Sequence, residues 1–197
     1  FNLLDTYGFT NVMTQNCIDS YVLDNADLII MNDQTIYSCS TNSDELNEWI
    51  NNGGSFIYSG DAYHWGYQGN ILNSILNNSG ISFVYASACS PVTNIADHPI
   101  TDGIDYYSIG TSSLAIINTD DSAISLIDDC SDNSYIAYST LGDGKVLVVA
   151  DEDLTDQEFF HDPAYSILGL NAALFLTDNT SYNNWLSFSP ASGTIPA

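Results

Sequence analysis

The chain has 197 residues, of which 45% are hydrophobic, and it carries 25 acidic residues against one Lys and no Arg, a net charge of −24. This length is enough for one α/β domain with a sizeable core. The charge excludes nucleic-acid binding, which needs Lys or Arg on phosphates, and disfavours anionic membrane surfaces. No apolar run approaches the ~20 residues of a membrane-spanning helix, so membrane insertion is not expected.

A strand–helix–strand unit over residues 26–61 organises the predicted fold. The apolar run 26–31 predicts a buried strand. Asn42, with Glu45 three residues later, predicts the start of a helix that ends at Gly53-Gly54. Residues 55–59 predict a second strand, and the three elements together form a right-handed unit with parallel strands.

The other expected elements extend this unit on both sides. Upstream we expect a helix over residues 1–7 and a strand over 11–14. Downstream we expect a helix capped by Asn70, a strand over 81–86, an irregular connection over 90–105, three short strands at 114–118, 123–127 and 135–139, a strong strand over 145–150, and a helix from 163 to about 175. Residues 1–178 are thus expected to form a three-layer, doubly wound α/β domain with a mostly parallel sheet. Residues 179–197 are expected to be a linker and the start of a following domain.

Four cysteines, Cys17, Cys39, Cys89 and Cys130, lack the CxxC spacing of a zinc site. In an extracellular protein they would form two disulfides, with three pairings open. We favour Cys17–Cys39 and Cys89–Cys130, because each pair lies at the ends of neighbouring predicted strands.

The order of these parts resembles the class I glutamine amidotransferase-like fold, in its non-amidotransferase branches such as trehalose-utilisation-like proteins. The segments that carry the resemblance are 26–54, 55–61, 98–104 and 142–151, followed by Asn171. In the amidotransferases a Cys nucleophile occupies the sharp turn that here follows Gly60, and this turn contains Asp61 and His64 but no Cys or Ser. The resemblance therefore implies the fold, speaks against the chemistry, and brings no expectation of a nucleotide cofactor.

Residues 185–197 are similar to the opening of a bacterial immunoglobulin-like repeat of the BACON type. This similarity implies a secreted or cell-surface multidomain protein. Its expected partners are other domains of the same polypeptide or other copies of it.

One candidate ligand site is the aromatic loop that contains Asp61, Tyr63, His64 and Trp65. It follows a parallel strand at the carboxyl edge of the sheet, where open α/β sheets bind ligands. Its aromatic faces could stack on a glycan, with Asp61 and His64 as polar contacts. The alternative is a packed loop that only caps the sheet.

A candidate calcium site is the acidic loop after residue 150, with Asp151, Asp153, Asp156 and Asp162 as the oxygen ligands. The loop lacks the spacing of an EF-hand, and the alternative is a solvated acidic loop. The acidity as a whole fits either bound Ca²⁺ or a saline habitat.

Three functions are open at this point. The first is a non-catalytic binding or assembly module of an extracellular protein. The second is a hydrolase or carbohydrate-active domain that uses Asp61 and His64. The third is a filament or surface-layer subunit whose sheet edges pair between chains while Ca²⁺ screens the acids.

Overall fold

The computed structural model describes residues 9, 17–32, 42–60, 67–109, 115–152, 154 and 163–178. The elements in chain order are α2 (Ser20–Asn25), β1 (Leu28–Asn32), α4 (Ser43–Asn51), β2 (Ser55–Ser59), α5 (Tyr67–Ile75), β3 (Ile81–Tyr85), β4 (Asn94–Ile95), β5 (Ala115–Thr119), β6 (Ala123–Asp128), β7 (Ser134–Leu141), β8 (Gly144–Val149) and α6 (Pro163–Leu176).

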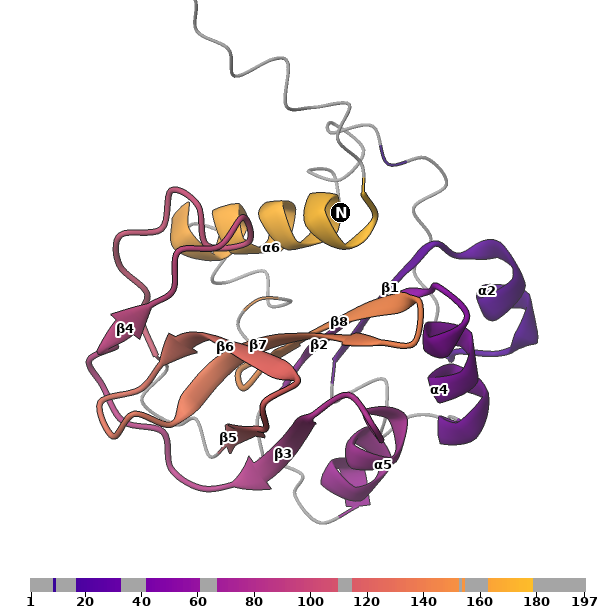
Figure 1. Cartoon of the computed structure of the whole chain (residues 1–197), viewed down its shortest axis with the longest axis horizontal. Coiled ribbons are helices and arrows are strands. Elements are labelled where there is room, and N and C mark those ends of the chain that lie inside the picture. Colours follow the sequence, from indigo (N-terminus) through magenta and orange to yellow (C-terminus); the bar gives the residue numbers. More distant parts are fainter. Residues whose placement is uncertain are drawn as a thin grey trace, which may run out of the picture.

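The strands form one open eight-stranded sheet flanked by helices, which confirms the predicted three-layer α/β class. The main order is β1-β2-β8-β7-β5-β3, and β6 joins β7 to the short β4. Helix α6 lies on one face of the sheet, and α4 and α5 lie on the other (Figure 1). β1 and β2 are parallel, as the predicted strand–helix–strand unit requires, and β8 is parallel to β2.

The other strand pairs are antiparallel, and short connections explain two of them. Gly142 and Asp143 join β7 directly to β8, and a two-residue loop makes a hairpin. Gly142 has φ +62°, a conformation that glycine adopts at little cost. β6 and β7 form a second hairpin, so the sheet is parallel at its β1 end and antiparallel beyond β8.

The helix predicted from the Asn42 cap is present. The Asn42 side chain accepts hydrogen bonds from the backbone N–H groups of Asp44 (3.2 Å) and Glu45 (3.4 Å). The helix ends at Asn51, and a Cβ at Gly54 would lie 2.4 Å from the Trp49 ring. Gly53 and Gly54 therefore form the turn that ends the helix, and the missing side chain of Gly54 leaves room for the Trp49 ring.

Two helices differ from expectation. Residues 20–25 form α2, which we did not predict, with Asp19 as its cap accepting from the Val22 N–H at 3.1 Å. Helix α5 begins at Tyr67, three residues before the cap expected at Asn70. The helix expected over 1–7, the strand expected over 11–14 and the tail over 179–197 lie outside the described residues.

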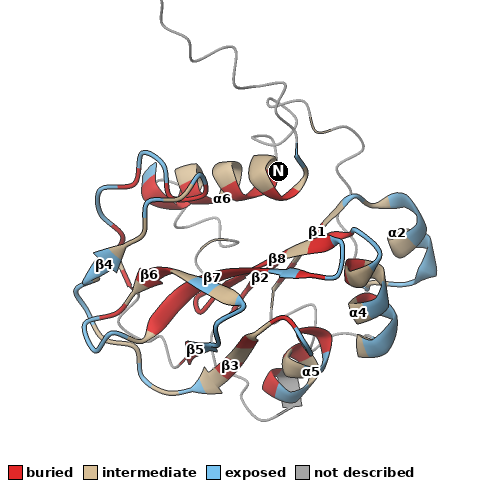
Figure 2. Cartoon of the chain, in the orientation of Figure 1, coloured by how far each residue is buried: buried red, intermediate tan, exposed pale blue. Residues whose placement is uncertain are grey.

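The core lies between β2, β8 and the helices on either face (Figure 2). All five residues of β2 are buried, as expected for a central strand covered on both faces. Helix α6 faces the sheet with Leu168, Ala172 and Leu176.

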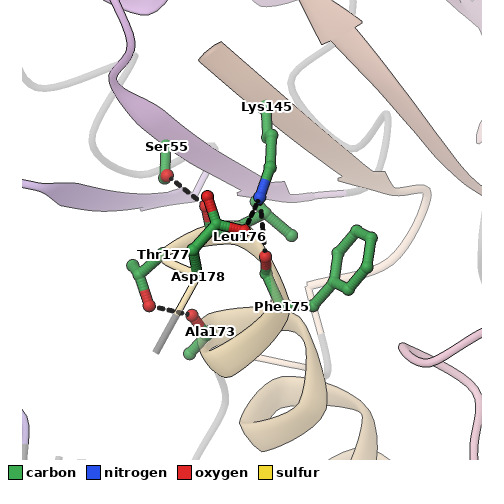
Figure 3. Close-up of polar contacts among 7 residues, drawn as sticks. All are labelled: Ser55, Lys145, Ala173, Phe175, Leu176, Thr177 and Asp178. Atoms are coloured by element: carbon green, nitrogen blue, oxygen red, sulfur yellow. Dashed lines mark hydrogen bonds and ion pairs between the residues drawn. The ribbon is translucent and has the colours of Figure 1, made fainter. Parts of the chain in front are cut away.

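The carboxyl end of α6 is held by donors at the start of β2 and β8 (Figure 3). Lys145 Nζ lies 3.0 Å from the Phe175 carbonyl oxygen and 2.5 Å from Asp178 Oδ1, and it sits 5.2 Å from the centroid of the Phe175 ring. Ser55 Oγ donates to the Leu176 carbonyl at 2.8 Å. Helix ends leave carbonyl groups unpaired and negatively polarised, so one cation and one hydroxyl here fix α6 onto the sheet.

We expect Lys145→Met to lower the free energy of unfolding by about 1–2 kcal/mol, because a charged hydrogen bond to a helix-end carbonyl is lost. The ion pair itself contributes little of this, since the Asp178 side chain is 81% exposed. Urea unfolding is the measurement, with Lys145→Arg as the control that keeps the charge. Equal stability of Lys145→Met and wild type would contradict this role.

Candidate functional site

The carboxyl ends of the parallel strands carry a buried polar group of three side chains, Ser59, Tyr135 and Asp151, which we call the carboxyl-edge cluster. Ser59 ends β2, is fully buried and donates to the Asp151 carbonyl oxygen at 2.6 Å. Asp151 is 4% exposed, and its carboxylate accepts a hydrogen bond from the Tyr135 hydroxyl. These bonds join β2, β7 and the end of β8.

Tyrosine rings cover this cluster. Tyr107 is 1% exposed, and its ring centroid lies 6.3 Å from that of Tyr135 and 4.8 Å from that of Tyr165. The Tyr165 hydroxyl donates to the Ser108 carbonyl at 2.6 Å, and this bond connects α6 to the segment that precedes β5. Burial and mutual hydrogen bonding make the cluster a structural element of the sheet edge.

The predicted ligand residues Asp61, Tyr63, His64 and Trp65 lie outside the described residues. The strand that leads to them is present, and its last residue, Ser59, pairs with Val149 of β8. The predicted aromatic ligand site therefore stays a prediction.

The predicted calcium site is described only in part. Asp153, Asp156 and Asp162 lie outside the described residues, whereas Asp151 belongs to the carboxyl-edge cluster. Within the described ranges, no three His, Cys, Asp or Glu side chains are grouped so that they could hold a metal ion. The calcium site also stays a prediction.

The Cys89–Cys130 disulfide is confirmed, with a Cα–Cα distance of 5.3 Å. It links the segment after β3 to the turn between β6 and β7. Cys17 is disulfide-bonded as well, and Cys39, its predicted partner, lies outside the described residues. A disulfide indicates folding in a non-reducing environment, and it leaves Cys89 without a thiolate that could act as a nucleophile.

Beside this disulfide the Asp129 carboxylate organises the β6–β7 turn. It is fully buried and accepts from the backbone N–H groups of Ser131 (2.8 Å), Asn133 (2.9 Å) and Cys89 (3.2 Å). The Asn133 side-chain amide adds bonds of 3.1 and 3.2 Å. Burial by itself raises the pKa of Asp129, but these hydrogen bonds outweigh it and hold the pKa below its ordinary value.

A second region, the loop from Val92 to Tyr107, surrounds a depression of about 510 Å³. The Asn171 side chain, from α6, donates to the carbonyls of Ile100 (3.2 Å) and Asp102 (2.9 Å). His98 braces the loop by accepting from the Ile100 N–H at 3.2 Å, and partial burial lowers its pKa. The sequence did not single out this depression, because it is formed by contacts between two limbs of an irregular segment.

Among the described residues, no helix is long and apolar enough to cross a membrane. No protein-family model matches the chain, and no curated protein matches it in sequence.

Solved structures do share the fold. The chain is similar to the cytoplasmic protein STM3548 from Salmonella typhimurium, with 19% identity, a TM-score of 0.55, and 78% of this chain and 73% of that chain covered. It is similar to the cytoplasmic protein STM1381 from Salmonella typhimurium LT2, with 15% identity, a TM-score of 0.60 and coverage of 88% and 85%. It is also similar to the mmIFT52 N-terminal domain, with 15% identity, a TM-score of 0.60 and coverage of 88% of each chain. Identities this low establish the α/β fold alone.

We expect Asp129→Asn to lower the free energy of unfolding by roughly 2–3 kcal/mol at neutral pH, because hydrogen bonds to a charged acceptor are lost. Asp121→Asn, at an exposed position, makes the same change in net charge and is the control. At pH values above the ordinary carboxyl pKa, the charged Asp129 carboxylate stabilises the folded state, because its pKa is lower there than in the unfolded chain. This contribution is lost as the pH falls through the lowered pKa of the folded state. Urea unfolding across that pH range should therefore show the difference between wild type and variant shrinking in acid. A difference that does not depend on pH would contradict the assignment.

Proposed function

We propose that the chain is a non-catalytic binding module of an extracellular or cell-surface multidomain protein, carried on an amidotransferase-like scaffold. The observation that supports this most is the state of the described side chains that could otherwise take part in catalysis. Cys89 is bonded to Cys130, while Ser59, Tyr135 and Asp151 are buried and hydrogen-bonded within the sheet edge. A nucleophile needs to be exposed to its substrate, and burial of Ser59, Tyr135 and Asp151 and the disulfide of Cys89 prevent this.

Two observations support an extracellular location. Disulfides persist in oxidising compartments, and Cys89–Cys130 is one. The resemblance of residues 185–197 to a BACON-type repeat points in the same direction. The two Salmonella proteins are titled cytoplasmic, but at 15–19% identity their location does not transfer to this chain.

The state of β3 favours binding over filament assembly through this strand. Among the described strands, β3 pairs only with β5, so its other side would be an open edge. Asn73 of α5 occupies that side, because its side chain accepts from the Phe83 N–H at 2.8 Å and donates to the Phe83 carbonyl at 3.1 Å. One amide thus replaces a neighbouring strand at the centre of β3, and blocked edges resist pairing between chains.

We expect Asn73→Ala to increase self-association, because it removes the amide that bonds both backbone groups of Phe83 and so closes this edge of the sheet. Sedimentation velocity over a concentration series is the measurement. Asn47→Ala is the matched control, since Asn47 also bonds helix and turn carbonyls, those of Ile75 and Asn77, but not a strand edge. Association that is equal in the two variants would contradict a closing role for Asn73.

The binding-module proposal is tested by assaying the purified protein on a broad panel of ester, peptide and glycoside substrates. We expect no turnover above background, and no change on Asp61→Ala or His64→Ala. Turnover that either substitution abolishes would replace the proposal with the hydrolase hypothesis.

A further inference from the structure

The depression lined by the segment from Val92 to Tyr107 has the features of a ligand site. One wall comes from residues 92–98 and the other from residues 101–107. Its volume of about 510 Å³ lies within the range of small-molecule sites.

The two walls are fixed to each other and to the body of the domain. Thr101 Oγ1 donates to the Ala96 carbonyl at 2.5 Å and is 3.0 Å from the His98 carbonyl, which bridges the walls. The His98 ring packs 4.8 Å from the Phe175 ring, and Asn171 holds the second wall. A site held in this way loses little conformational entropy when a ligand binds.

The rim has one large aromatic face. Tyr106 is 65% exposed, whereas its neighbour Tyr107 is 1% exposed and belongs to the core. An exposed tyrosine at the edge of a polar depression offers a flat apolar surface with a polar tip. Such a face stacks on the C–H side of a sugar ring.

The polar groups around Tyr106 are hydrogen-bond acceptors. Asp97 lies on one wall of the depression, and Asp102 and Asp105 lie on the other. All three are exposed, and no described residue donates a hydrogen bond to their carboxylates. The single Lys of the chain is at position 145, where it bonds Phe175 and Asp178. Ligand hydroxyl groups are the donors that such a rim can use, and anionic ligands are repelled.

The spacing of the acids separates two ligand classes. A small cation needs several oxygens converging on one point. Within the described residues no three acidic, His or Cys side chains are so arranged, and this covers Asp97, Asp102 and Asp105. Acceptors spread around an aromatic face fit an extended ligand with many hydroxyl groups better than they fit a point charge.

We infer that this depression binds a neutral oligosaccharide, stacked on Tyr106 and hydrogen-bonded by Asp97, Asp102 and Asp105. The inference rests on the proposed binding function and gives it a ligand class and a place. Sulfated and carboxylated glycans are excluded by the same acids that accept hydroxyl groups from neutral ones.

The test is a glycan array that carries neutral, sulfated and sialylated oligosaccharides, followed by calorimetry with the strongest neutral binder. We expect signal from neutral glycans only. Tyr106→Ala should weaken binding by about tenfold or more, and Asp102→Asn should weaken it too. Tyr21→Ala and Asp121→Asn, which change an exposed Tyr and an exposed Asp elsewhere, should leave it unchanged. All four positions are exposed, and circular dichroism confirms that each variant is folded.

Absence of any neutral binder, or binding that Tyr106→Ala leaves intact, would overturn the inference. Binding that collapses with added salt and is reproduced by oligolysine would also overturn it, because a cationic ligand would then occupy the site. Failure of the binding-module proposal looks different. It would appear as hydrolysis of the bound glycan, with release of shorter sugars, whether or not binding depends on Tyr106.

Discussion

The structure depends on one electrostatic constraint: 25 acidic side chains share a single Lys. Buried carboxylates ordinarily rely on a cation or on several hydrogen-bond donors. In the described part of the chain, Asp129 and Asp151 are the only buried ionisable acids, and Lys145 is engaged elsewhere with Phe175 and Asp178. Asp129 is therefore stabilised by backbone and amide N–H groups, and Asp151 accepts from a tyrosine hydroxyl. Neutral donors perform the role that ion pairs perform in most proteins.

This constraint connects the fold to the proposed function. The donors that stabilise Asp129 come from the turn between β6 and β7 and from Cys89, so the carboxylate and the disulfide together hold the segment after β3 against that turn. Asp151, with Ser59 and Tyr135, occupies the carboxyl edge where this type of sheet usually places its chemistry. Ser59, Tyr135 and Asp151, at that edge, therefore have a structural role. The exposed acceptors and the exposed tyrosine lie instead on the loop from Val92 to Tyr107, where a binding function fits better than a catalytic one.

The sequence predicted the parts of the fold that local patterns determine. The apolar runs that became β1, β2 and β8, the Asn42 cap and the Cys89–Cys130 pair are all present. Helix α2 was missed because its residues show no clear helical stripe, and none of them is buried. The depression between residues 92 and 107 could not be predicted, since Thr101 and Asn171 shape it through bonds to carbonyls, and the partner of Asn171 is about seventy residues away in sequence. Long-range hydrogen bonds of this kind leave no periodic signal.

The titration of Asp129 tests the account most directly, since stabilisation by neutral donors must appear in its pKa. Carboxyl ¹³C chemical shifts of Asp129, followed by NMR from neutral pH into acid, give that pKa in the folded protein. We predict a value below the ordinary Asp value of about 3.9, because the donated hydrogen bonds outweigh burial. A value above it would mean that burial outweighs the donated hydrogen bonds, which would contradict the stabilisation of this carboxylate by neutral donors.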